Sequence, residues 1–178
     1  MSANSIAPLM TSFQQDFQVT VGISSAIPFL NTIGVTLANI VGSMIIAQLG
    51  LKTAIIIAIS LGMIGAFLFI TAQTFYFLIL DSFFVGAGTG ATFMTLSSIY
   101  AHLDEKLQNF GLFHAFFGIG GIIAPFLVSV FLYFGLNYRY VFFIYLLALL
   151  ILAIVAKFSK IVINKKYEAI KFKEAFSI

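Results

Sequence analysis

The chain has 178 residues, of which 61% are hydrophobic and only 8% are charged. A soluble globular domain carries about 25% charged residues, so this chain has too little charge to cover a surface that faces water. The composition therefore excludes a soluble enzyme, a nucleic-acid-binding module and a disordered chain, and it predicts an integral membrane protein. There is no cysteine, and the two histidines are far apart in sequence. We therefore expect no metal site, no cofactor and no enzymatic activity.

Long apolar segments follow one another along the chain with short polar connections. A membrane-spanning helix needs about 20 apolar residues. Residues 17–51 carry no charge, and the next uncharged stretch is divided by a polar turn at 71–74. We therefore predict an all-α integral membrane protein with five transmembrane helices. They lie near residues 21–49, 53–70, 75–100, 110–134 and 139–157.

The chain divides into three regions: residues 1–20, a five-helix bundle at 21–157, and a basic tail at 158–178. The first region holds no Lys or Arg, so it lacks the positive segment of a signal peptide. In the tail, apolar residues recur at helical spacing between lysines, which favours an amphipathic helix lying on an anionic leaflet. A solvated tail without helix is the alternative.

The basic residues predict the orientation of the bundle. Eight lysines fall on the side of the tail, if Lys52 and Lys106 are counted with it, and only Arg139 falls on the other side. Because Lys and Arg concentrate on the cytoplasmic side, we expect a multi-pass protein of the cell membrane with its C-terminus in the cytoplasm and its N-terminus outside.

Small residues recur at four-residue spacing in the predicted helices. Helices in lipid pack through small residues, so these positions indicate close neighbours. A proline in the fourth predicted helix removes a backbone hydrogen bond and predicts a bend. The residues that we expect to serve helix packing are Gly34, Ala38, Gly42, Gly86, Gly90, Gly118 and Pro125.

Two ionisable residues lie inside predicted spans and are candidates for binding a solute or an ion. Asp81 would lie about 10 Å into its helix, where it could take up a proton or hold a cation. Alternatively, it reaches water at the outer interface or caps a neighbouring helix. His114 could couple to a proton or bond a sugar hydroxyl, or it could bond a backbone carbonyl in the packing. The neutral polar candidates are Asn31, Asn39, Thr89, Thr92 and Thr95.

Residues 43–52 read Ser-Met-Ile-Ile-Ala-Gln-Leu-Gly-Leu-Lys and connect the first two predicted helices. Taken with segments 82–91, 111–125 and 138–143, they resemble the major facilitator superfamily of secondary transporters, whose turn between the second and third helices reads G-x-x-x-D-R-x-G-R-K. Gly50 and Lys52 match that motif, whereas Ser43 replaces its first glycine and its other charges are missing. The resemblance assigns Ser43, Gly50 and Lys52 to a gating turn.

Three further segments carry the same resemblance. Residues 82–91 are similar to R-x-x-x-G-x-G-x-G of the family's fourth helix, with Ser82 in place of arginine. Residues 111–125 resemble the fifth helix, and H-x-x-F-G-x-G followed by a proline is similar to the fucose and related sugar permeases. Residues 138–143 look like the W-R-x-x-F start of the sixth helix.

The resemblance implies helices 2–6 of the N-terminal half of such a transporter, without most of the first helix and without the second half. Residues 1–20 would then be the outer end of a truncated first helix and an external loop. The family places its substrate site at the midplane between two halves. The first hypothesis is therefore a transporter fragment or half that moves a small solute, such as a sugar, another metabolite or a drug. It would work by alternating access, with a proton as one candidate coupling ion, and would need a second half or a second copy. The alternative is a non-transporting membrane subunit that packs a partner through its glycine stripes.

Overall fold

The structure, a computed structural model, describes residues 2–103 and 105–159, and it is helical throughout, with no strand in those ranges. The basic tail at 158–178 falls almost wholly outside them, so its amphipathic helix stays a prediction. The elements are α1 (Ser2–Phe17), α2 (Val21–Ser24), α3 (Ala26–Thr71), α4 (Phe75–Ala101), η1 (Glu105–Leu107), α5 (Phe110–Tyr133) and α6 (Arg139–Phe158).

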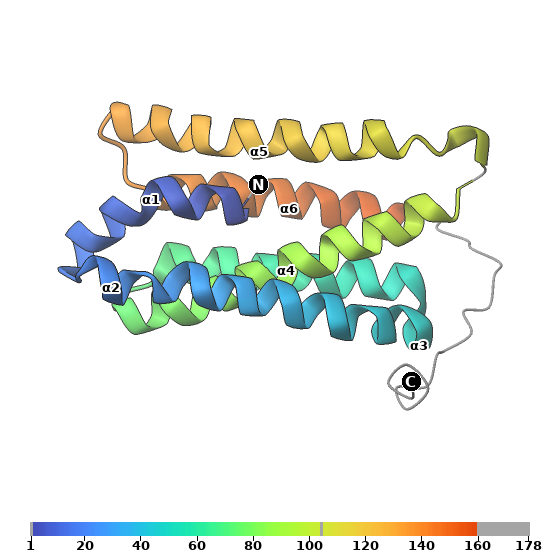
Figure 1. Cartoon of the computed structure of the whole chain (residues 1–178), viewed down its shortest axis with the longest axis horizontal. Helices are drawn as coiled ribbons and strands as arrows, with labels where there is room; N and C mark the ends of the chain where they lie inside the picture. The colour runs from blue at the N-terminus through green and yellow to red at the C-terminus, as the bar shows by residue number, and fades with distance from the viewer. Residues whose placement is uncertain (1, 104, 160–178) are drawn as a thin grey trace.

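Within the described ranges, four helical stretches are long and apolar enough to cross a membrane, and the longest, Val21–Thr71, contains two of the predicted spans. It is interrupted at Gly50, whose φ of 79° and ψ of 165° are not helical. The chain reverses direction there, so α3 is a hairpin with a first arm, residues 26–49, and a second arm, residues 51–71 (Figure 1). Each arm is long enough to span a bilayer. Counting the two arms separately yields the five spans that the sequence predicts.

Helix α4 packs against both arms of α3 through glycines on all three segments. A Cβ added at Gly90 would lie 2.7 Å from the backbone oxygen of Val35 in the first arm. A Cβ at Gly65 in the second arm would lie 2.5 Å from the backbone nitrogen of Val85. Since no room is left for a side chain, the backbones of these helices are in direct contact, which is how small residues let helices approach in lipid.

Helix α1 covers only part of the bundle. It begins about midway along the long axis and runs to the end where α2 begins (Figure 1). Its buried face includes Phe13, whose ring meets Tyr138 edge-on at 4.9 Å between centroids and lies 6.0 Å from Phe69. Residues 1–20, which the sequence assigns to the outer end of a helix and a loop, thus contain a helix that is anchored by aromatic packing.

Helix α6 packs on the second arm of α3. Phe69 and Phe142 stack with their centroids 4.1 Å apart, and Leu149 lies against Gly62, where an added Cβ would be 3.1 Å from its Cδ1. Farther along the pair, Ile55 and Ile59 continue the same buried cluster. This contact fixes α6 against the hairpin along most of its length.

Helix α5 contacts α1 and, less extensively, α6, and it leaves most of its surface open. Phe116, Ile122 and Phe126 are 66%, 73% and 65% exposed. Pro125 lies inside the helix, and a Cβ at Gly118 would meet nothing within 4 Å. The apolar face of α5 therefore contacts lipid or another protein rather than the described part of this chain.

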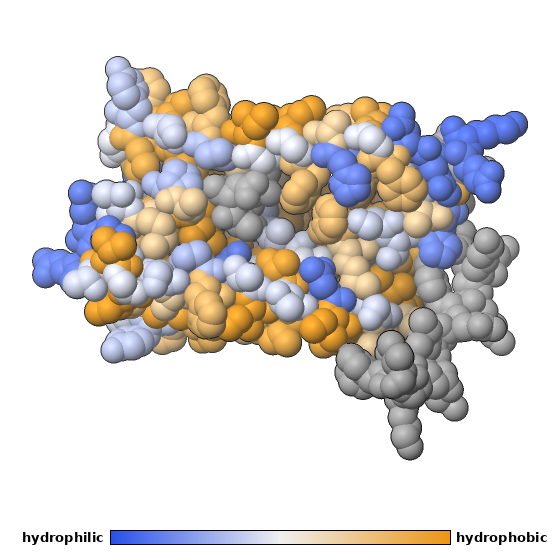
Figure 2. Space-filling model, viewed as in Figure 1, coloured by the Kyte–Doolittle hydropathy of each residue, from blue (hydrophilic) through white to orange (hydrophobic). Residues whose placement is uncertain are grey.

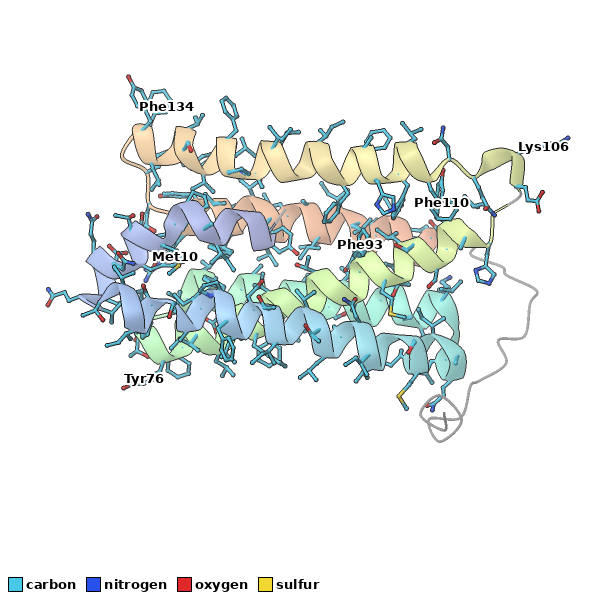
Figure 3. All side chains as sticks on the ribbon, viewed as in Figure 1. Met10, Tyr76, Phe93, Lys106, Phe110 and Phe134 are labelled. Atoms are coloured by element: carbon cyan, nitrogen blue, oxygen red, sulfur yellow. The ribbon has the colours of Figure 1, made fainter. Side chains whose placement is uncertain are left out.

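The surface has the polarity of a membrane protein. The most hydrophilic residues gather at the two ends of the long axis, with a broad hydrophobic band between them (Figure 2). Phe134 and Tyr76 lie at one end, and Lys106 lies at the other (Figure 3). We call the first the Tyr76 end and the second the Lys106 end.

Candidate functional site

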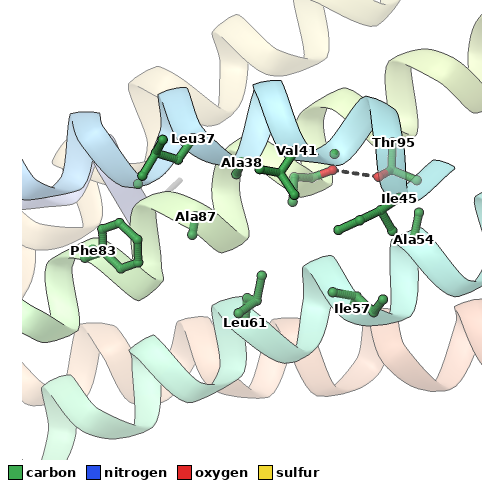
Figure 4. A pocket seen from close by; sticks show the side chains of 13 residues that line it. Leu37, Ala38, Val41, Ile45, Ala54, Ile57, Leu61, Phe83, Ala87 and Thr95 are labelled. Atoms are coloured by element: carbon green, nitrogen blue, oxygen red, sulfur yellow. Dashed lines mark hydrogen bonds between the residues drawn. The ribbon is translucent and has the colours of Figure 1, made fainter. Parts of the chain in front are cut away.

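An apolar groove of about 220 Å³ lies between α4 and the two arms of α3 (Figure 4). Thr95 is a polar member of its lining, and its hydroxyl donates to the carbonyl of Ala91 at 2.7 Å. With that hydrogen engaged, the groove can accept hydrocarbon but provides little recognition for a polar solute. Its lining includes Gly34, Leu37, Ala38, Val41, Gly42, Ile45, Ala54, Ile57, Leu61, Phe83, Ala87 and Ala91.

A second hollow, also about 220 Å³, opens near the turn between α3 and α4, and Asp81 lines it. We call it the vestibule, defined by Leu68, Thr71, Ala72, Gln73, Phe77 and Asp81. Asp81 is only 1% exposed, and neither carboxyl oxygen has a hydrogen-bond partner among the described residues. A buried carboxyl group without a partner is rare. In the described residues the Tyr138 hydroxyl and Arg139 Nε are likewise buried without one, but Asp81 is the carboxyl group among them.

Arg139 bonds to the turn between α3 and α4, next to the vestibule. Its Nη2 donates to the carbonyl of Ala72 at 2.8 Å, and its guanidinium lies 6.0 Å from the centre of the Tyr138 ring. This contact joins the start of α6 to the end of α3. The sequence analysis used Arg139 for the orientation and as part of a family-like motif, but it did not predict this contact, because the acceptor is a backbone carbonyl that no side-chain pattern reveals.

Asn31 and Ser82 hold α3 against α4 rather than facing a cavity described here. Asn31 Nδ2 donates to the backbone oxygen of Ser82 at 2.9 Å, and the Ser82 hydroxyl donates to the carbonyl of Ile27 at 3.0 Å. Both residues are buried. Asn31 thus has a structural hydrogen bond, although the sequence makes it a candidate for binding solute.

The remaining neutral candidates are dispersed. Thr89 is half-buried, and its hydroxyl donates to the carbonyl of Val85 in its own helix at 2.8 Å. Thr92 is half-buried, and Asn39 is exposed on the first arm of α3. None of these three residues lines the vestibule with Asp81.

His114 is exposed on α5, with its ring 5.5 Å from Phe113 and 6.3 Å from Phe93. Phe93 lies between α4 and α5 (Figure 3). Both phenylalanines line a third hollow of about 340 Å³ between these helices. The structure therefore places His114 beside an aromatic cleft and not beside Asp81.

The predicted gating turn lies at the Lys106 end, where α3 reverses. Gly50 provides the positive φ, and Lys52 is exposed just after it. Ser43 is exposed in the first arm, and its hydroxyl donates to the carbonyl of Ile40 at 2.9 Å. The turn thus has the reversal that the sequence motif predicts. Within the described ranges, no group of three or more His, Cys, Asp or Glu side chains could hold a metal ion.

A bundle of long apolar helices with glycine-mediated contacts is the architecture of a multi-pass membrane protein. The sequence model described as Major Facilitator Superfamily matches residues 1–175, and the chain belongs to this family. Its members are transporters rather than enzymes. Comparison with curated proteins and with solved structures gives no match.

Proposed function

We propose that the chain is one half of a secondary transporter that moves a small solute across the membrane by alternating access. The observation that carries the proposal is the family match over residues 1–175. Transporters of this kind bind solute near the midplane between two structurally similar halves. The groove between α3 and α4 has a largely apolar lining. We therefore propose that this chain supplies one wall of the solute site and that a second half or a second copy supplies the other.

The open surfaces of the bundle support this arrangement. The first arm of α3 exposes Leu37 and Val41 beside the groove, and α5 exposes Phe116 and Phe126. Large apolar side chains exposed on these helices are suited to contact with another protein. His114 lies on α5 and Thr92 on α4, and we propose them as polar contacts for the solute.

The orientation follows from the distribution of basic residues. Lys106 marks the Lys106 end (Figure 3), and Lys52 follows the reversal of α3 at the same end. Arg139 bonds Ala72 in the turn before α4, near the Tyr76 end. By the positive-inside rule, the Lys106 end faces the cytoplasm of a cell membrane and the Tyr76 end faces outside. On this orientation the vestibule lies toward the outside, whereas the groove runs along the middle of the bundle, from Phe83 to Thr95 of α4.

Solute exchange in proteoliposomes tests the transport function. The full chain would be reconstituted and assayed for counterflow of radiolabelled sugars, carboxylic acids and cationic drugs. We expect saturable exchange of one solute class, reduced by Thr92→Val and by His114→Ala. Absence of exchange for every class, in vesicles where circular dichroism shows the helical fold and cross-linking shows paired copies, would contradict transport by two copies of this chain.

Cross-linking tests whether two copies pair through the proposed face. The sequence has no cysteine, so a single cysteine reports one position without background. Leu37→Cys lies on the first arm of α3, and Ile151→Cys, on α6, is a matched exposed control. We expect a cross-linked dimer from Leu37→Cys only. Equal cross-linking at both positions would indicate random encounter in the membrane.

The alternative function is a membrane subunit that binds a partner through its glycine stripes without transporting anything. Gly86 and Gly90 already contact the first arm of α3 within this chain, so they are not free for a partner. Gly118, which has open space around it, is the glycine that this alternative would use. A stable partner that co-purifies with the chain and is lost in Gly118→Leu would favour this reading over transport.

A further inference from the structure

We propose that Asp81 binds a proton and is a neutral carboxylic acid in this conformation. Its proton exchanges with water only through the vestibule at the Tyr76 end. The inference rests on the proposed function in one respect only, the use of this proton as the coupling ion. The chemistry is a simple association, in which the carboxylate accepts one proton from water and no other bond forms or breaks.

The burial of Asp81 favours its neutral form. The side chain is 1% exposed, and neither oxygen has a hydrogen-bond partner among the described residues. An ionised carboxylate in such a place would lose its hydration without compensation, whereas the neutral acid loses far less. A buried charge persists when it is paired, and no such pair is present at Asp81 in the described bundle.

The charged and titratable groups on the neighbouring helices do not compensate a negative charge at Asp81. Arg139 of α6 donates through Nη2 to Ala72, whereas its Nε and the Tyr138 hydroxyl are buried without a hydrogen-bond partner, and neither reaches Asp81. The Tyr138 ring packs against Phe13. Asp16 of α1 is exposed and has the same sign, and Lys52 is at the opposite end of the second arm of α3. The group therefore gains more from a proton than from any cationic side chain around it.

The vestibule suits a proton better than a metal cation. Cations such as Ca²⁺ and Mg²⁺ require about six or more oxygen ligands, including water. Thr71 uses its hydroxyl hydrogen on the carbonyls of Phe67 and Leu68, at 3.1 and 3.2 Å, and the Ala72 carbonyl accepts from Arg139. Leu68 and Phe77 make the rest of the wall largely apolar. One carboxyl group in such surroundings can hold a proton without further ligands.

The packing beyond Asp81 closes the path toward the middle of the bundle. On the next residue, the Ser82 hydroxyl donates to Ile27 at 3.0 Å, and the Ser82 carbonyl accepts from Asn31 at 2.9 Å. One turn farther, Val85 lies against Gly65, where an added Cβ would be 2.5 Å from its nitrogen. These contacts leave the vestibule as the route for water. Release to the other side requires α4 to separate from α3, which is the kind of rearrangement that alternating access provides.

Infrared spectroscopy tests the protonation state directly. The full chain, labelled with ¹³C-carboxyl aspartate, would be reconstituted in phosphatidylcholine vesicles at neutral pH. We expect the C=O band of a protonated carboxylic acid, lost in Asp81→Asn and retained in the matched control Asp16→Asn. Absence of the band in the unchanged chain, or its survival in Asp81→Asn, overturns the proposal. Circular dichroism of each variant checks its fold.

Thiol labelling tests the route of exchange. Gln73→Cys lines the vestibule, and Tyr76→Cys is 83% exposed at the same end but outside it. After modification with a bulky thiol reagent, we expect hydrogen–deuterium exchange of the Asp81 band to slow in Gln73→Cys only. Equal exchange rates in the two modified variants overturn the vestibule route. Because neither measurement needs a solute, the band can be present while counterflow fails, and the two proposals are judged separately.

Discussion

The amide of Asn31 donates to the backbone oxygen of Ser82 across the contact between α3 and α4, at 2.9 Å. Ser82 returns a bond of 3.0 Å from its hydroxyl to the carbonyl of Ile27, one helical turn before Asn31. Gly86 lies one turn farther along α4, where an added Cβ would be 3.0 Å from the Cα of Asn31. Two hydrogen bonds and a glycine contact thus fix the register of these helices next to the vestibule.

Replacing Asn31 by leucine should destabilise the bundle modestly. The change removes one interhelical hydrogen bond from a buried position, and such bonds in membrane proteins contribute about 0.6 kcal/mol on average and up to about 1.7 kcal/mol. We expect a loss of about 1 kcal/mol in the free energy of unfolding, measured by titration with a denaturing detergent in mixed micelles. Asn39→Leu is the control, because Asn39 is exposed, and it should change little. Equal losses would mean that the bond contributes nothing.

Adding a methyl group at Gly86 should separate α4 from the first arm of α3. The new Cβ would collide with the carbonyl of Asn31, which is backbone and cannot rotate away. Overpacking of this kind costs about 1–3 kcal/mol. We expect Gly86→Ala to lower the melting temperature, whereas Gly118→Ala should leave it unchanged, since nothing lies within 4 Å of a Cβ there. A pronounced loss at Gly118 would instead reveal a partner on α5.

Alanine at Gly50 should strain the reversal between the two arms of α3. The φ of 79° and ψ of 165° lie in a region that only glycine readily adopts, and a side chain there costs about 1–3 kcal/mol. We expect Gly50→Ala to lower the stability of the purified protein in thermal melts followed by circular dichroism. Gly22→Ala, with open space around the added carbon, is the matched control. If both variants melt like the unchanged chain, the reversal is not under this constraint.

Removing the guanidinium of Arg139 should loosen the contact between α6 and the end of α3. Arg139→Met keeps the length of the side chain and removes the bond to Ala72. Because Arg139 is half-buried, water replaces part of the interaction, and we expect a loss of about 1 kcal/mol. Hydrogen–deuterium exchange should increase at residues 71–74. Lys157→Met, exposed near the other end of α6, should leave that exchange unchanged, and a similar increase there would assign the effect to lost charge alone.

The succession of spans was predictable because each one is an uncharged apolar run of membrane length. Gly50 was recognised as part of a turn between two such runs, and the structure places a reversal there. The spacing of Gly34, Gly86 and Gly90 indicated close packing, but it could not show that they serve contacts within this chain. Helix α1 was only partly predicted from the sequence. Its apolar residues Ile6, Leu9 and Phe13 are buried in one cluster with Phe69 and Tyr138, which are distant in sequence.

The candidate site was less predictable. Asp81 and Asn31 were both selected as polar residues at depth, yet Asn31 has a hydrogen bond to Ser82 and Asp81 has none in the described bundle. Sequence gives the type of a side chain and its approximate depth, but not the donors and acceptors that neighbouring helices bring to it. His114 illustrates the same limit, because its place beside Phe93 depends on how α5 lies against α4.

The sequence by itself determined that this chain is a multi-pass helical membrane protein, the order of its spans and its family. Those properties depend on hydrophobicity, local turns and motif order, which can be read directly from the order of the residues. Only the tertiary structure decided which polar groups are paired, that the glycines of α4 touch both arms of α3, and that Asp81 lies alone in a vestibule. The reason is that burial and hydrogen bonding are properties of helices packed against one another, and residues far apart in sequence supply the partners.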